Sequence, residues 1–308
     1  MGKTSVASRL NIPGRIAWFT MECPGFLTLL YIMKTLPAKY GITDLPWQNK
    51  VLAGLFVRIP LTFSPPCFPF LLRGTQIVWT LGKFPSCWCN ELTEWPRNCQ
   101  IKQVLHYTYR AVLFPFLQPS MSPIHVSVWA LALSFQLCNA TSIGSWLAAY
   151  GPTTAAAWDS TGPWATARFV LGISVFYLGL SGNFFHDEEL REIRRRKAKA
   201  ARVAEKEDAT ADRKEGGRKE GDGGVEKHYA LPEAGFFRFM LYPHYLCEWV
   251  EWAGFWIAAG WGCVPARAFL VNEVVTMAPR AVRGKWWYIE RFGEEKVGKK
   301  WAILPGVY

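Results

Sequence analysis

The sequence predicts an all-α integral membrane protein, a bundle of about six transmembrane helices in a single domain over residues 1–308. Half of the 308 residues are hydrophobic and only 19% are charged, against about 25% in an average soluble domain. Residues 111–158 contain no Asp, Glu, Lys or Arg, and such a run is long enough for two spans at about 20 residues each. The apolar runs lack the alternation of barrel strands, so the spans should be helical.

Four further apolar runs supply the remaining spans: 16–33, 166–185, 234–259 and 261–275. The first ten residues are mostly polar, and no small-residue cleavage site follows an apolar core, so no cleavable signal peptide is expected.

Basic residues set the expected orientation. The net charge is 35 − 24 = +11, and two tracts carry much of the excess. Residues 191–227 hold 13 Lys or Arg against 9 acids, and residues 280–300 hold 7 against 3. Both tracts should lie in the cytosol by the positive-inside rule. Residues 195–228 have few large apolar side chains and are expected to form a disordered cytosolic loop. The interleaved acids and missing aromatics argue against nucleic acid as a partner.

Four of the eight cysteines fall in one stretch, at Cys67, Cys87, Cys89 and Cys99. The spacing lacks a C-x₂-C pair, and no histidine lies nearby. We therefore expect unligated thiols in a reducing compartment and no metal site.

Ionisable groups at membrane depth are candidate functional residues, because a charge there is costly unless it is paired, protonated or facing a polar cavity. Glu22 lies one to two turns into the first span, and Tyr107 with Arg110 precedes the long apolar run. A second group recurs every three or four residues and so shares one helical face: Asn183, Asp187, Leu190, Arg191 and Arg194.

A third group follows in the C-terminal part of the chain. His244, Glu248 and Glu251 fall within two helical turns, and Arg280 and Tyr288 come after them. Carboxylates, arginines and aromatic rings together suit a nucleotide cofactor. No GxGxxG, Walker A or HExxH motif is present, so neither a Rossmann nor a P-loop site is expected.

Several segments carry a family resemblance: PGRIAWFTMECPGF, HYTYRAVLFPFL, GLSGNFFHDEELREIR, HYALPEAGFFRFMLYPHYLCEWVEWAGF and RFGEEKVGKKWAILP. They resemble the steroid 5α-reductase family, multi-pass enzymes of the endoplasmic reticulum membrane. These enzymes reduce the 4,5 double bond of 3-oxo-Δ4 steroids with NADPH. The resemblance implies the family's seven-helix fold, here without its first helix. It also implies a cofactor site facing the cytosol, built largely by a C-terminal half over residues 229–308.

The resemblance assigns roles by position. Glu22 and Tyr107 match the family's pair that holds the substrate ketone, where a carboxyl kept neutral by burial can donate a hydrogen bond. The residues that match the NADPH site are Arg110, Asn183, Asp187, Arg194, Tyr229, Glu248, Arg280 and Tyr288. His244 belongs to the same site, in a position where the family usually has an asparagine.

Residues 57–103 interrupt the resemblance, because joining Phe56 to Val104 restores a continuous family segment. Our hypothesis is a retained intron translated in frame, and the alternative is a lineage-specific loop.

The expected function is therefore NADPH-dependent reduction of a steroid or sterol-like enone, with membrane lipids and the lipid substrate as partners. One alternative is an enoyl reductase of a fatty or isoprenoid lipid, which needs no ketone-binding pair. The other is a catalytically inactive paralogue that persists as a membrane interaction protein.

Overall fold

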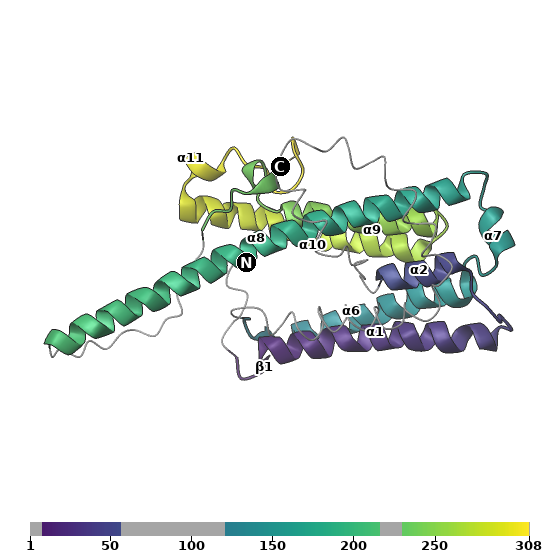
Figure 1. The fold of residues 1–308 in the computed structure, drawn as a ribbon, viewed down its shortest axis with the longest axis horizontal. Helices are drawn as coiled ribbons and strands as arrows, with labels where there is room; N and C mark the ends of the chain where they lie inside the picture. The colour runs from purple at the N-terminus through teal and green to yellow at the C-terminus, as the bar shows by residue number, and fades with distance from the viewer. Residues whose placement is uncertain (1–7, 57–120, 216–229, 308) are drawn as a thin grey trace, which may run out of the picture.

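The computed structural model describes residues 8–56, 121–215 and 230–307, and within them the chain is mostly helical (Figure 1). Two short strands, β1 (Asn11–Ile12) and β2 (Ile124–His125), pair antiparallel. The longer helices are α1 (Gly14–Lys39), α2 (Trp47–Phe56), α6 (Val126–Ser145), α8 (Ala165–Glu215), α9 (Pro243–Ala259) and α10 (Val264–Phe292). The short helical segments are the π-helix η3 (Trp146–Tyr150), α7 (Ala155–Asp159), the 3-10 turn η4 (Gly235–Arg238) and α11 (Glu294–Val297).

Helices α1 and α6 run side by side in the same direction, along the lower edge of Figure 1. Their starts are joined by the β1–β2 pair, and glycines bring the two backbones together. A Cβ on Gly25 would lie 3.4 Å from the Cβ of Gln136, and a Cβ on Gly144 would lie 3.0 Å from the Leu29 side chain. Small residues at helix contacts permit this close packing in membranes.

Helices α8 and α9 form an antiparallel pair that is packed even more closely. A Cβ added at Gly172 would lie 2.6 Å from the Cα of Ala258, and one at Gly182 would lie 2.7 Å from the Cys247 sulfur. Helix α10 packs on the same α9, so α9 is largely buried. This arrangement places the N-terminal half of α9 between two helices that carry predicted site residues.

The main core is aromatic and lies where α2, α8, α9 and α10 meet. The rings of Trp252 and Phe269 are 4.2 Å apart between centroids, and Phe56 contacts both edge-on. A polar group is buried beside this core. Asn49 has no exposed surface, donates to the carbonyls of Leu147 and Pro152, and accepts from the indole N–H of Trp158.

Three stretches of the described chain are long and apolar enough to span a membrane: Gly14–Lys39, Val126–Tyr150 and Ala165–Arg196. They contain the predicted spans 16–33 and 166–185. The predicted pair of spans in 111–158 lies partly outside the described residues, which begin again at residue 121. Residues 126–150 are one continuous helical stretch that ends at Gly151–Pro152, and the run then closes with the short α7.

The predicted spans 234–259 and 261–275 also differ from the structure. The first is broken, because η4 and a buried turn precede Pro243, which fits the first turn of a helix and starts α9 there. The second begins only at Val264 and continues as α10 to Phe292, well beyond residue 275. A count of six spans is therefore not established by the described residues.

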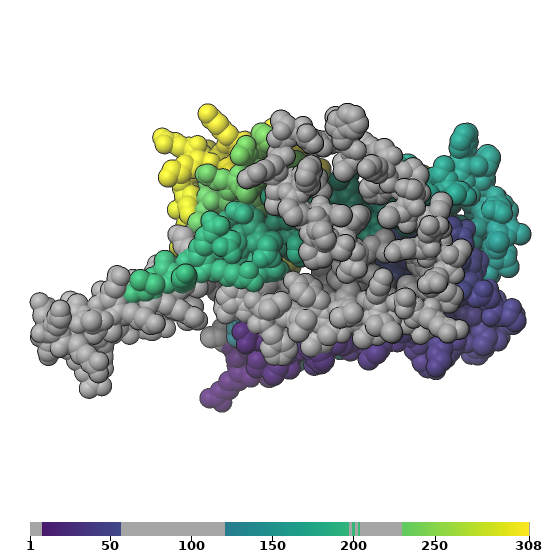
Figure 2. Space-filling view, in the orientation of Figure 1, coloured from purple at the N-terminus to yellow at the C-terminus, as the bar shows by residue number. Residues whose placement is uncertain are grey.

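Residues 195–215, expected to be a disordered loop, continue α8 as helix to Glu215. Ala, Glu, Lys and Arg are strong helix formers, and ion pairs along the helix reinforce them. Arg196 bonds Glu192 at 2.9 Å, one turn away, and Arg195 reaches Glu188 at 3.1 Å. This end of α8 extends beyond the rest of the described molecule (Figure 1), and its coloured part emerges at the left of the space-filling view (Figure 2). Residues 216–228 and the insertion 57–103 lie outside the described residues.

Candidate functional site

Glu22 lies on the face of α1 that packs against α6, and only 9% of its surface is exposed. The side-chain amide of Gln136 donates a 3.1 Å hydrogen bond from Nε2 to Oε2 of Glu22. Nearby, the indole N–H of Trp129 donates to the Thr20 hydroxyl at 3.0 Å, which adds a second polar link between the helices. Tyr107, the predicted partner of Glu22, lies outside the described residues.

The predicted cofactor residues within the described chain come from three helices: Asn183, Asp187 and Arg194 from α8, His244 and Glu248 from α9, and Arg280 and Tyr288 from α10. All of these except Asn183 take part in ring contacts or electrostatic interactions around the start of α9. Arg110 and Tyr229 lie outside the described residues.

Tyr245 lies at the centre of one group of these predicted cofactor residues. The Arg280 guanidinium, Asp187 and Glu248 all lie close enough to act on its hydroxyl electrostatically. The neighbouring Tyr242 contacts Tyr288, with 6.3 Å between ring centroids. Groups of α8, α9 and α10 are therefore gathered around two buried phenols.

His244 lies at the centre of a second group of the predicted cofactor residues. It is 9% exposed, and Glu248 and Arg194 both act on it electrostatically. Its Nδ1 is buried and has no hydrogen-bond partner among the described residues. A buried polar atom without a partner costs about 1–3 kcal/mol, so a bound ligand that hydrogen-bonds Nδ1 would relieve a real penalty. The arginines, carboxylates and this free ring nitrogen fit the phosphates, hydroxyls and amide of a nicotinamide dinucleotide.

Asn183 is buried on α8. It directly follows Gly182, which faces Cys247 of α9. Arg191, which shares its helical face, is buried and ion-paired with Glu188. The structure thus places Asn183 at the α8–α9 contact, and Arg191 in an ion pair within its own helix.

Two residues that the sequence did not single out fix the η4 turn beside this cluster. His186 is bonded through Nδ1 to the Gly182 carbonyl at 2.6 Å, and its Nε2 accepts from the Phe236 N–H at 3.2 Å. Lys300 donates to the Phe237 carbonyl at 2.5 Å, and burial lowers the pKa of its ammonium. Phe237 in turn contacts His244, with centroids 6.2 Å apart.

The partners of His186 and Gln136 explain why the sequence did not reveal them. Phe236 is 50 residues from His186, and Glu22 is 114 residues from Gln136. The only local signal was a histidine within the Asn183-to-Asp187 segment. Gln136 stands in a helix that has no charged residue but several other polar ones.

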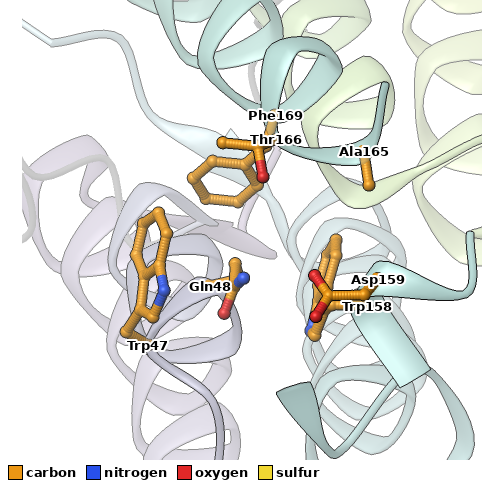
Figure 3. Close-up of a pocket in the computed structure, with 7 residues that line it drawn as sticks. All are labelled: Trp47, Gln48, Trp158, Asp159, Ala165, Thr166 and Phe169. Carbon is orange, nitrogen blue, oxygen red and sulfur yellow. The ribbon is translucent and has the colours of Figure 1, made fainter. Parts of the chain in front are cut away.

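A small pocket lies elsewhere, where α2, α7 and the start of α8 meet (Figure 3). Gln48 lies between the rings of Trp47 and Trp158, Thr166 lies above it beside Phe169, and Asp159 is at the edge. None of the predicted site residues lines this pocket, so we do not assign the reaction to it.

Metal ligation has no candidate in the part of the chain that the structure describes, where no three His, Cys, Asp or Glu side chains cluster. Cys23, Cys138, Cys247 and Cys263 are free thiols. The predicted cysteine stretch from Cys67 to Cys99 lies outside the described residues.

A family model described as 3-oxo-5-alpha-steroid 4-dehydrogenase matches residues 122–207 and 218–308, which together make up more than half of the chain. The matched ranges contain every predicted cofactor residue except Arg110. Glu22 and Tyr107 lie outside them.

Curated relatives agree with this match over longer stretches. An uncharacterized protein of Schizosaccharomyces pombe is 26% identical over 99% of this chain and 89% of its own length. The steroid 5-alpha-reductase DET2 of Arabidopsis thaliana is 27% identical over 80% of this chain and 83% of its own. The bovine 3-oxo-5-alpha-steroid 4-dehydrogenase 1 is 27% identical over 70% of this chain and 76% of its own.

Proposed function

We propose a reductase activity for this chain, which belongs to the 3-oxo-5-alpha-steroid 4-dehydrogenase family. The resemblance drawn from its sequence motifs is thereby confirmed. The family consists of NADPH-dependent oxidoreductases of multi-pass membrane type. For this chain the proposed reaction is saturation of the 4,5 double bond of a 3-oxo-Δ4 steroid or a sterol-like enone, with NADPH as donor.

The observation that carries the proposal is the gathering of predicted cofactor residues around the start of α9. Asp187, Glu248 and Arg280 come from three helices, and all three act electrostatically on Tyr245. His244 lies next to that residue, with its Nδ1 buried and unpartnered among the described residues. Charged groups gathered beside a buried ring nitrogen that lacks a partner suit the binding of a polar cofactor.

We assign the activation of the substrate ketone to residues in the N-terminal part of the chain. When bound, NADPH would supply a hydride to the β-carbon of the enone, and negative charge would build on the ketone oxygen. We assign Glu22 and Tyr107 to that oxygen as hydrogen-bond donors, because donors aimed at developing charge lower the barrier. A proton then goes to the α-carbon, which balances the reduction. Glu22 is suited to this role because it lies at a helix contact with its carboxyl held by one neighbour.

The proposed location is the endoplasmic reticulum membrane, with the cofactor site on the cytosolic side. The cofactor cluster lies towards the end of the bundle from which the basic part of α8 extends (Figure 1). Lys and Arg accumulate on the cytosolic side of membrane proteins, so the two assignments support each other.

The test is NADPH consumption by microsomes that express the full chain, with progesterone or testosterone as substrate. Glu22→Leu, which cannot donate a hydrogen bond, should lower kcat about 100-fold or more, the typical cost of removing an oxyanion donor, while NADPH binding to the purified protein stays unchanged. Asp159→Asn, a carboxylate change in the unrelated pocket, is the control and should leave turnover intact.

Other outcomes separate the alternatives. Turnover of a fatty or isoprenoid enoyl substrate that survives Glu22→Leu would favour the enoyl reductase. Purified protein that does not bind NADPH would refute the reductase proposal and favour an inactive membrane paralogue.

A further inference from the structure

We propose that Gln136 is a positioning residue for the reaction: it occupies one carboxyl oxygen of Glu22 and so leaves the other to donate to the substrate ketone. The inference rests on the proposed function, in which Glu22 acts on that ketone.

The first support is the geometry of the contact. Gln136 is partly buried, and its Nε2 lies 3.1 Å from Oε2 of Glu22. Within the part of the chain that the structure describes, the other oxygen, Oε1, has no hydrogen-bond partner. One oxygen of the carboxyl is thus engaged by α6 and the other is available.

The second support is that α1 and α6 are in contact at this point. Gly25 lies one turn after Glu22 on α1, and an added Cβ there would be 3.4 Å from the Cβ of Gln136. The two backbones are therefore close beside the side chain that holds Glu22. On the other side, Trp129 and Thr20 form the second polar link between the helices. Reacting groups have to be fixed within a fraction of an ångström to be effective.

The chemistry of the Gln136 amide and the Glu22 carboxyl then determines which carboxyl oxygen carries the proton. An amide nitrogen can only donate, so the Glu22 oxygen that faces it must accept. In a neutral carboxyl one oxygen accepts and the other carries the proton. In the neutral carboxyl that the proposed function assigns to Glu22, Oε2 is the acceptor, so the proton belongs on Oε1.

This arrangement favours the transition state over the ground state. As charge develops on the ketone oxygen, the Oε1 proton is drawn towards it and negative charge grows on the carboxyl. The Gln136 N–H then points at a more negative acceptor, and hydrogen bonds to charged groups are stronger than those between neutral groups. An interaction that strengthens during the reaction raises kcat.

The experiment compares full-length wild type with Gln136→Met, which keeps the side-chain length and removes the donor. We expect kcat for the enone to fall about tenfold, the effect of one hydrogen bond of about 1.4 kcal/mol, with the KM for NADPH unchanged. Ser142→Ala is the matched control, because the Ser142 hydroxyl bonds only carbonyls of its own helix. It should leave both constants unchanged.

A second readout does not depend on turnover. Infrared spectra identify the carboxyl C=O band of Glu22 as the band that Glu22→Gln removes. In Gln136→Met this band should move to higher frequency, because its carbonyl oxygen has lost a hydrogen bond. Gln136→Asn, whose amide is one methylene short, should behave in the same way and serves if the Met variant does not fold.

The outcomes separate the inference from the function on which it rests. Wild-type protein that does not reduce the enone refutes the proposed function. Wild-type protein that turns over, combined with an unchanged Glu22 band and an unchanged kcat in the Gln136 variants, overturns the role of Gln136. A shifted band with a lowered kcat supports both.

Discussion

Asn49 offers the sharpest test of how the helices around the core are joined. Its side chain is fully buried and makes three hydrogen bonds: to the Leu147 carbonyl at 2.6 Å, to the Pro152 carbonyl at 2.9 Å, and from Trp158 Nε1 at 2.6 Å. These partners belong to η3, to the loop after it and to α7. One amide therefore joins α2 to three separate segments, and we predict that Asn49→Leu strongly destabilises the fold.

The magnitude follows from the groups left behind. Each buried donor or acceptor that loses its partner costs about 1–3 kcal/mol, so three of them cost about 3 kcal/mol at the least. Leucine has a similar size, so little of the effect comes from a cavity. At about 2 °C per kcal/mol for a chain of this length, Tm should fall by about 6 °C or more.

The assay is thermal unfolding of the detergent-solubilised full chain, followed by circular dichroism. Gln48→Leu is the matched control, because Gln48 precedes Asn49 on α2 and its Oε1 is buried without a partner among the described residues. It should leave Tm unchanged or raise it slightly. Equal Tm values for Asn49→Leu and Gln48→Leu would refute the reasoning, because the three bonds would then contribute nothing.

Two further predictions concern residues near the start of α9, where the predicted cofactor residues gather. A Cβ on Gly284 would overlap the Tyr242 hydroxyl and lie 2.5 Å from its ring, so Gly284→Ala should displace Tyr242. We expect the KM for NADPH to rise about tenfold, the effect of an overpacking cost of about 1–3 kcal/mol. Gly262→Ala, where a Cβ meets nothing within 4 Å, should leave it unchanged, and equal KM values would contradict the steric argument. Burial lowers the pKa of Lys300, so the folded chain releases this proton at a lower pH than the unfolded chain. Stability linked to Lys300 should therefore rise as pH increases through the folded pKa towards the ordinary value of about 10.4. The Tm of wild type relative to Lys300→Met should increase over that window; a constant difference would show that burial leaves the pKa unchanged.

Local composition predicted the wrong state for the charged tract. Residues 195–215 have few large apolar side chains, which suggested disorder, yet they continue α8 to Glu215. Helix propensity and pairs such as Arg196 with Glu192 outweighed the lack of a buried face. The reverse error occurred at 234–259, where hydropathy predicted one span but the backbone breaks before Pro243. Residues 301–302 explain the break. The N–H of Tyr242 donates to the Ala302 carbonyl, so it does not take part in a helical hydrogen bond.

The predicted cofactor residues could be recognised from the sequence because several of them share short motifs. Asp187 and Arg194 recur on one helical face, and His244 and Glu248 are one turn apart. The face follows from the 3.6-residue period alone. Sequence did not reveal that Tyr245 would be the residue on which Arg280 and the carboxylates converge, since that depends on how α8, α9 and α10 are rotated against one another.

The sequence by itself determined that this chain is a membrane protein and which family it belongs to. Long uncharged apolar runs indicate a membrane environment. The motifs around Glu22, Asn183 and Glu248 are local patterns that can be recognised without knowledge of the fold. Only the tertiary structure decided which distant groups touch: Gln136 with Glu22, and His186 with the η4 turn. The physical reason is that such contacts depend on the separation and rotation of packed helices. Those are set by glycines and side-chain shapes on both partners at once, and no single segment encodes them.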